Sequence, residues 1–335
     1  MYPAVKKLHI FVIVLLIFAI IAATFSVFVT IVRNNAPSPA ATIDPPIWPD
    51  MPANTNPNLK YFGYYHFSEP EAINAVAEMG NANVAKADAD CLDEIANLAA
   101  KDFKILIMTR HIFFKSGELK PDYQQIWEQT KINIAPYMDN IIGFYVDEPM
   151  WTGKSQEAFQ TSCQIVRQDF PDKIMMAMVC WFSVITPNLI GYEPDEYFKY
   201  CTDLGFDYYH PWDKDYFLYN VNVFKTKVAV HNQKIWLSPK GFYVADHDKS
   251  INWLNEDTTL PHGDDIVNWI KGCYEVAVED HDIVGFFTFV YGSDSEIDSY
   301  DHWLAQYFDV DGEFYRKDIR ELYIDIGKAI IANDN

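Results

Sequence analysis

The sequence lacks the motifs of several protein classes. It has no CxxC pair, no HxH or HExxH spacing, no GxSxG and no P-loop. We therefore expect no cofactor and no identifiable metal-ligand set, and neither a serine hydrolase nor a nucleotide-binding enzyme. Its five cysteines are scattered and odd in number, unlike a disulfide framework. We expect mostly buried free thiols, with a single disulfide as the alternative.

Positive charge is scarce outside the N-terminus. The formal net charge is −21, and the first 33 residues hold three basic and no acidic residues. The remainder therefore has 23 basic against 47 acidic residues, a net charge of −24. A body this acidic is not expected to bind nucleic acid, because that affinity depends on Lys and Arg side chains.

Charged residues are absent from Ile10 to Val32. As a helix, this stretch would span about 34 Å, enough to cross a bilayer core of about 30 Å. Lys6 and Lys7 precede it and favour a cytoplasmic N-terminus. We expect residues 1–33 to be a signal anchor with one transmembrane helix through the lipid bilayer at residues 10–32, and the body to lie on the extracytoplasmic side. A cleaved signal peptide and a secreted body are the alternative.

Proline dominates the next stretch, with seven residues between Pro37 and Pro57. This composition is typical of a semi-extended linker rather than a packed core. We assign residues 34–58 to this linker and residues 59–335 to one folded domain.

Short apolar runs alternate with helical patterns through this domain. The runs are 61–65, 83–88, 104–110, 141–146, 173–180, 206–210, 234–238 and 283–290. Continuous apolar strands are expected in a parallel sheet covered on both faces. No glycine-rich turn follows the first run, where GYYHFSEPE stands, and this disfavours a dinucleotide-binding open sheet. Eight units of this length predict a (β/α)8 TIM barrel.

The strongest functional signal is NIIGFYVDEPMW, from Asn140 to Trp151. TIM-barrel sites form at the carboxyl ends of the strands, and the fourth predicted strand runs directly into Asp147 and Glu148. Neighbouring carboxylates push their pKa values apart, so one can keep a proton near neutral pH. The structural alternative is that Asp147 caps the following helix and Glu148 is a solvated loop residue.

Other acids and aromatic residues follow the remaining strands. Asp213 and Asp294 are candidates for a second catalytic carboxylate, with Asp88 a further one. Aromatic residues make up 16% of the chain, and such rings can stack on sugar faces. The structural alternative for each ring or histidine is packing or an ordinary hydrogen bond. The residues proposed to bind substrate are Tyr64, His66, Asp88, Arg110, Trp151, Trp181, His210, Trp212, Lys240 and Tyr291.

The segment GFYVDEP resembles the N-E-P signature of the large retaining clan of barrel glycoside hydrolases. The resemblance covers the barrel as a whole and three motif residues. It implies that Glu148 is the acid/base and that Asp147 stands where the clan has an Asn holding the sugar 2-hydroxyl. The sequence departs from the clan at the seventh strand, where IWLSPKGFY offers Lys240 instead of the nucleophilic Glu.

The expected function is a glycoside hydrolase acting on a cell-surface or extracellular polysaccharide. Glu148 would be the general acid/base and Asp147 the neighbouring carboxylate. Asp147 could instead orient a substrate acetamido group as internal nucleophile, as adjacent Asp-Glu pairs do in N-acetylhexosaminidase-like barrels. Two other classes remain open: a non-catalytic carbohydrate-binding barrel, and a metal-dependent or Schiff-base barrel enzyme using Lys240.

Overall fold

The computed structural model describes residues 48–65, 67–185, 191–209, 212–243, 262–289, 291, 302–303 and 316–334. Residues Asp50–Asn335 form one compact unit. The predicted membrane anchor at residues 10–32 and the linker residues 34–47 lie outside the described residues. Among the residues that are described, no helix is both long and apolar enough to span a bilayer.

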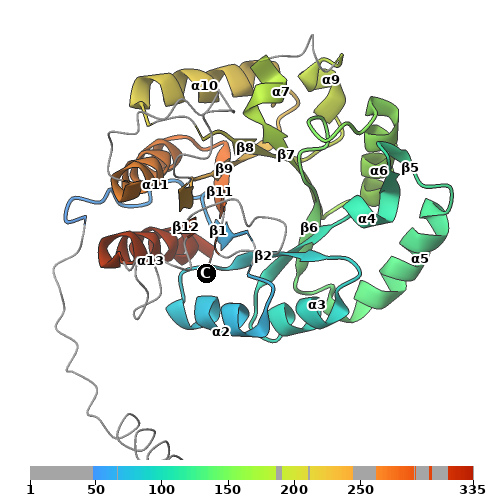
Figure 1. The fold of residues 1–335 in the computed structure, drawn as a ribbon, viewed down its shortest axis with the longest axis horizontal. Coiled ribbons are helices and arrows are strands. Elements are labelled where there is room, and N and C mark those ends of the chain that lie inside the picture. The colour runs from blue at the N-terminus through green and yellow to red at the C-terminus, as the bar shows by residue number, and fades with distance from the viewer. Residues whose placement is uncertain are drawn as a thin grey trace, which may run out of the picture. The chain divides into compact units, whose positions relative to one another are not determined.

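Eight parallel strands close into a barrel, as predicted (Figure 1). Each strand pairs with the next barrel strand along the chain, and the last pairs with the first. The strands are β1 (Tyr61–Tyr64), β2 (Val84–Asp88), β3 (Lys104–Met108), β6 (Ile141–Val146), β7 (Ile174–Cys180), β8 (Asp203–Asp207), β9 (Lys234–Ser238) and β11 (Ile283–Thr288).

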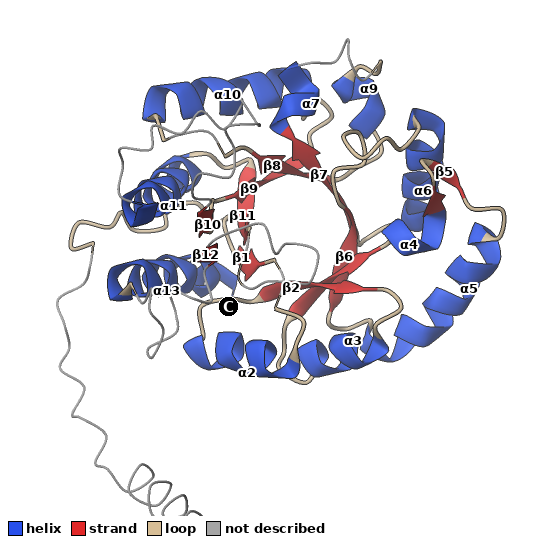
Figure 2. Cartoon of the chain, viewed as in Figure 1, coloured by secondary structure: helices blue, strands red, loops and turns tan. Residues whose placement is uncertain are grey.

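Helices surround the barrel (Figure 2). The longer ones are α2 (Pro70–Met79), α3 (Leu92–Ala99), α5 (Tyr123–Ile134), α6 (Gln156–Asp169), α10 (Lys214–Lys227), α11 (His262–Glu279) and α13 (Lys317–Ile331). Shorter ones are α4 (Arg110–Phe113), α7 (Trp181–Ile185), α9 (Pro194–Phe198) and the 3-10 turns η1 (Ala135–Tyr137) and η2 (Ala332–Asp334). Two small sheets lie outside the barrel: β4 (Phe114–Lys115) with β5 (Glu118–Leu119), and β10 (Phe242–Tyr243) with β12 (His302–Trp303).

The sixth barrel strand begins and ends earlier than predicted. We expected residues 206–210, but β8 covers Asp203–Asp207. The buried Asp203 carboxylate accepts hydrogen bonds from the Trp236 indole (2.8 Å) and the Thr202 hydroxyl (2.7 Å). Those bonds allow an acid inside a strand, where hydrophobicity alone does not predict one. The shift makes Asp207 the last residue of the strand.

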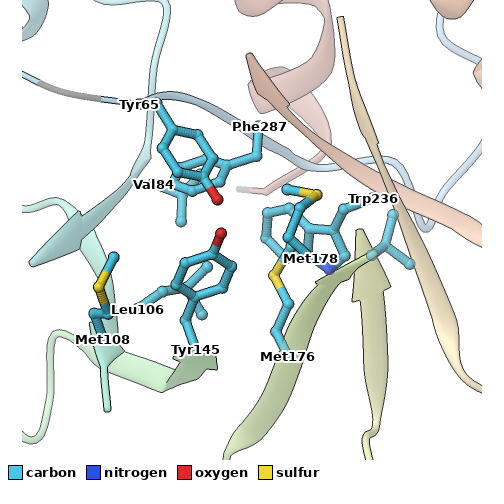
Figure 3. Packing of buried hydrophobic residues seen from close by; sticks show 10 residues of the cluster. Tyr65, Val84, Leu106, Met108, Tyr145, Met176, Met178, Trp236 and Phe287 are labelled. Atoms are coloured by element: carbon cyan, nitrogen blue, oxygen red, sulfur yellow. The ribbon is translucent and has the colours of Figure 1, made fainter. Parts of the chain in front are cut away.

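The barrel interior is filled by large side chains, several of which Figure 3 shows. This cluster comprises Tyr65, Val84, Leu106, Met108, Tyr145, Met176, Met178, Trp236, Val284 and Phe287. Strands β6 and β7 also approach each other closely. At Gly143 on β6, a Cβ atom would lie 2.5 Å from the Ile174 carbonyl oxygen on β7. The strand that carries Asp147 and Glu148 is therefore held closely against its neighbour.

The last residues of the predicted linker belong to the barrel unit, which begins at Asp50 rather than at residue 59. Proline content alone did not reveal the hydrogen bonds of this segment. Tyr274 donates a hydrogen bond to the Pro52 carbonyl oxygen at 2.9 Å. The buried Asn56 amide donates to the carbonyl oxygens of Ala277, Asp280 and Ile283 at 2.8–3.0 Å. The segment is therefore fixed to the amino-terminal end of the barrel.

We expect Asn56→Ala to lower the free energy of unfolding by about 3 kcal/mol, because it leaves buried carbonyl oxygens without a donor. Urea denaturation of the full-length protein measures the change. Asn58→Ala is the matched control, since the Asn58 amide makes one solvent-exposed hydrogen bond, to His281. Equal losses for the two variants would contradict a structural role for Asn56.

Candidate active site

Glu148 has an unusual backbone conformation at the carboxyl end of β6. Its φ is +35°, in a region that non-glycine residues rarely adopt. Such a conformation costs about 1–3 kcal/mol and is typical of functional sites. The turn is closed by Thr152, whose backbone N–H and hydroxyl both donate to the Glu148 carbonyl oxygen, at 2.9 and 2.7 Å. The turn thus holds the glutamate in a conformation that the chain does not favour by itself.

The Glu148 carboxyl group is hydrogen-bonded to Asp207 at the end of β8 and to Cys180 at the end of β7. Asp207 is in turn hydrogen-bonded to Tyr209, whose hydroxyl lies 2.8 Å from the Ser238 hydroxyl at the end of β9. Because a carboxylate can only accept, Tyr209 donates to Asp207 and Ser238 donates to Tyr209. One hydrogen-bond network thus joins the carboxyl ends of four neighbouring strands.

Burial, the charges of Asp207 and Asp147, and the hydrogen bond to Asp207 all raise the pKa of Glu148 far above that of an ordinary glutamate. Burial also raises the pKa of Asp207, but hydrogen bonds from Glu148 and Tyr209 oppose that rise. The proton of the pair therefore resides on Glu148 at neutral pH. This arrangement supplies a protonated carboxyl group at the strand ends, as a general acid requires.

Asp147 faces the barrel interior and contacts two tyrosines. The hydroxyl of Tyr65, which follows β1, donates to Asp147 Oδ1 at 3.1 Å, and the Tyr145 hydroxyl donates to the same oxygen. Figure 3 shows the two tyrosine hydroxyls pointing toward each other inside the barrel. Donors to a carboxylate favour its charged form. Asp147 does not cap the next helix, because Ser155 caps α6.

The structure gives several predicted site residues other roles. Asp213 is exposed and caps α10, accepting from the Tyr216 backbone N–H at 2.7 Å. Tyr64 is buried beside α13 and accepts a hydrogen bond from Asn81 at 2.6 Å. Arg110 begins α4 instead of ending the third strand. Asp294, His66 and His210 lie outside the described residues.

The predicted aromatic platforms are mostly packed inside the fold. Trp181 is buried against Phe206 and Tyr208, Trp212 packs on Trp269, and Tyr291 packs on Tyr64. Trp151 alone among these rings is largely exposed, at 48%, and it contacts Phe182 edge to face. Lys240 is buried beyond the end of β9, and its carbonyl oxygen accepts from the Tyr323 hydroxyl at 2.8 Å. Stacking on an open ring is therefore available at Trp151.

Four residues of this site were not among the predicted site residues: Asp207, Tyr209, Ser238 and Tyr65. Asp207 is second in the predicted strand, whereas it is the last residue of β8. The available signal was an acid interrupting the apolar pattern of LGFDYY. Tyr65 was passed over for Tyr64, although alternation along β1 sends only one of the two inward. Cys91, Cys163, Cys180, Cys201 and Cys273 are all free thiols, as predicted, but Cys91 is exposed.

We expect Glu148→Gln to stabilise the protein at pH 8 by about 1–3 kcal/mol. The pKa of Glu148 is higher in the folded than in the unfolded protein. Its contribution to stability is therefore full at pH 4 and is lost as the pH rises. Gln carries no charge and avoids that loss. Denaturation at pH 5 and pH 8 measures the change, with the exposed Glu157→Gln as control. A stabilisation that is the same at both pH values would contradict the assignment.

Comparisons with known proteins agree with the fold. No protein-family model and no curated protein sequence matches the chain. A Bacteroides thetaiotaomicron structure to which an alpha-L-fucosidase activity is ascribed aligns over 84% of this chain and 98% of its own, with TM-score 0.51 and 10% identity. The GH2 beta-galacturonidase from Eisenbergiella tayi, bound to galacturonate, aligns over 79% of this chain with TM-score 0.50 and 10% identity. The chain matches 48% of that galacturonidase, about half its length. At this identity the likeness shows a shared barrel fold.

Proposed function

We propose that the protein is a glycoside hydrolase in which Glu148 donates the proton to the glycosidic oxygen. The observation that carries the proposal is the partly buried, hydrogen-bonded Glu148–Asp207 pair at the carboxyl ends of the barrel strands. Glycosidic cleavage requires a carboxylic acid that is still protonated at neutral pH. Burial and the charge of Asp207 provide that condition at Glu148.

Asp207 is assigned to the control of this proton rather than to attack on the sugar. Retaining enzymes hold their two catalytic carboxyl groups about 5–5.5 Å apart, and inverting enzymes hold them about 6.5–9.5 Å apart. Asp207 is directly hydrogen-bonded to Glu148, which is closer than either arrangement.

Asp147 is then the neighbouring carboxylate that faces the reacting sugar. Its charge, supported by Tyr65 and Tyr145, would stabilise the positive charge that develops on the sugar ring in the transition state. The same position suits a carboxylate that orients a substrate acetamido group. Cleavage of 2-acetamido sugars but not of the parent hexosides would favour this second role.

The proposed substrate is a cell-surface or extracellular polysaccharide. This part of the proposal rests on the predicted anchor at residues 10–32, which would carry the barrel on the extracytoplasmic side. Membrane fractionation of the full-length protein, followed by protease accessibility of the barrel in intact cells, tests the placement. A barrel protected from protease until the cells are lysed would contradict it.

The hydrolase proposal is tested by offering the full-length protein 4-nitrophenyl glycosides of common hexoses, 2-acetamido hexoses, deoxyhexoses and uronic acids in both anomeric forms. We expect release of nitrophenol from at least one of them. Binding of a sugar without cleavage of any glycoside in the panel would instead support a non-catalytic barrel.

A further inference from the structure

A pocket lies at the carboxyl ends of β1 and β2, beside the start of α3. Its volume is about 260 Å³, and its lining includes Phe67, Glu69, Lys86, Asp88 and Glu94. Pockets for drug-sized ligands usually measure about 300–1,000 Å³. This pocket is therefore sized for one small ring rather than for a chain of several sugars.

Two charged side chains of the pocket, Asp88 and Lys86, can form further hydrogen bonds. Asp88 Oδ1 is buried and has no hydrogen-bond partner among the described residues. The Lys86 ammonium lies 5.7 Å from the centre of the Tyr65 ring. Within the part of the chain that the structure describes, the Lys86 side chain makes neither a hydrogen bond nor an ion pair. A buried acceptor without a donor costs about 1–3 kcal/mol, and a bound ligand would remove that cost.

The pocket is linked to the candidate active site by one side chain. The Tyr65 ring faces Lys86, and the Tyr65 hydroxyl donates to Asp147 at 3.1 Å. A ligand that contacts Lys86 is therefore separated from the Asp147 carboxylate by the Tyr65 side chain. The pocket therefore lies at the same end of the barrel as the candidate active site.

The charges of the pocket select among ligands. A carboxylate-bearing sugar would meet Asp88 and Glu69, and an amine-bearing sugar would meet the Lys86 ammonium. Burial raises the pKa of Glu94 to about 7, so this group can both donate and accept near neutral pH. Sugar hydroxyl groups can donate to Asp88 and accept from Lys86 at the same time. The set therefore disfavours a carboxylate-bearing sugar and suits a hydroxyl-rich ring.

We propose that this pocket is a second sugar subsite, which holds a neutral pyranose unit next to the bond cleaved at Glu148. The inference rests on the proposed hydrolase function. It identifies the substrate as an oligosaccharide or polysaccharide with a neutral unit at this position. Lys86 and Asp88 are its specificity-determining residues.

The kinetic test compares a 4-nitrophenyl monosaccharide with the corresponding 4-nitrophenyl disaccharide of a neutral sugar that the protein cleaves. We expect kcat/KM to be at least tenfold higher for the disaccharide. Lys86→Met and Asp88→Asn should each lower this disaccharide-to-monosaccharide ratio toward one. Lys101→Met and Asp93→Asn, which alter exposed residues in and just after α3, are the matched controls and should keep the parent ratio. A ratio unchanged in both pocket variants would overturn the subsite.

A binding measurement separates failure of the subsite from failure of the hydrolase proposal. Saturation-transfer NMR would be recorded with methyl glucoside, methyl galactoside and methyl mannoside, and with glucuronate and glucosamine as charged probes. We expect a response from a neutral glycoside that Lys86→Met and Asp88→Asn weaken, even if no glycoside is cleaved. A stronger response from glucuronate or glucosamine than from the neutral glycosides would overturn the assignment to a neutral sugar. So would a response in the two variants that equals the response of the parent protein.

Discussion

Replacing Glu148 with Gln is expected to lower kcat/KM for glycosides with poor leaving groups, such as phenyl and natural linkages, by about 10²–10⁴-fold. The amide preserves the shape of the side chain and can still hydrogen-bond to Asp207, but it cannot deliver a proton. Initial rates with the full-length variant measure the effect. Circular dichroism and thermal unfolding establish that the variant is folded.

The dependence on the leaving group distinguishes lost acid catalysis from lost binding. A 2,4-dinitrophenyl leaving group departs without protonation, so its release by Glu148→Gln should stay within about tenfold of the parent rate. Thr152→Val is an informative companion, because it removes one hydrogen bond to the Glu148 carbonyl oxygen and leaves the carboxyl group in place. Equal losses for phenyl and dinitrophenyl glycosides in Glu148→Gln would contradict the role as general acid.

Replacing Asp207 with Asn is expected to move the alkaline limb of the pH–rate profile to lower pH by about one pH unit or more. This shift corresponds to an about tenfold change in proton concentration. The proposed mechanism requires protonated Glu148, so activity should fall as the pH rises through the pKa of Glu148. The charge of Asp207 and its hydrogen bond both raise that pKa. Without the charge, Glu148 loses its proton at lower pH, and the rate on the alkaline side falls in proportion to the protonated fraction.

The pH profile of kcat/KM between pH 4 and pH 10 measures this change. Asp213→Asn is the matched control, because Asp213 is an exposed helix cap on the segment that follows the same strand. Its profile should keep the parent alkaline limb. An alkaline limb unmoved in Asp207→Asn would mean that the pair does not govern the proton on Glu148.

The barrel was predictable because its strands are apolar and regularly spaced. Ile141–Val146 and Lys234–Ser238 have the bounds that the sequence predicted. The predicted strand bounds were wrong where a polar side chain inside the fold has a hydrogen-bond partner. The carboxylate of Asp203 is paired with Trp236 from the neighbouring strand, and that partner is not visible in local sequence.

The candidate site was predicted in part. Asp147 and Glu148 stood out because two acids follow directly on a buried strand. Their partners Asp207, Tyr209 and Ser238 come from strands far along the chain, and only strand order brings them together. Trp181 packs on Phe206 and Trp212 packs on Trp269, and composition does not reveal whether a ring packs in the core or faces solvent. Their roles in substrate binding stay predictions. The predictions for Asp294, His66 and His210 remain predictions.

The docking of Pro52 and Asn56 at the amino-terminal end of the barrel has a practical consequence. Glu148 lies at the other end of the strands, so the backbone joins the barrel at the base formed by the amino-terminal ends of the strands. An affinity tag, a fluorescent protein or an immobilising surface attached ahead of Asp50 is therefore linked through that base. Polymer substrates should still reach the mouth of the barrel in such fusions, whereas attachments within the loops that follow the strands should obstruct it.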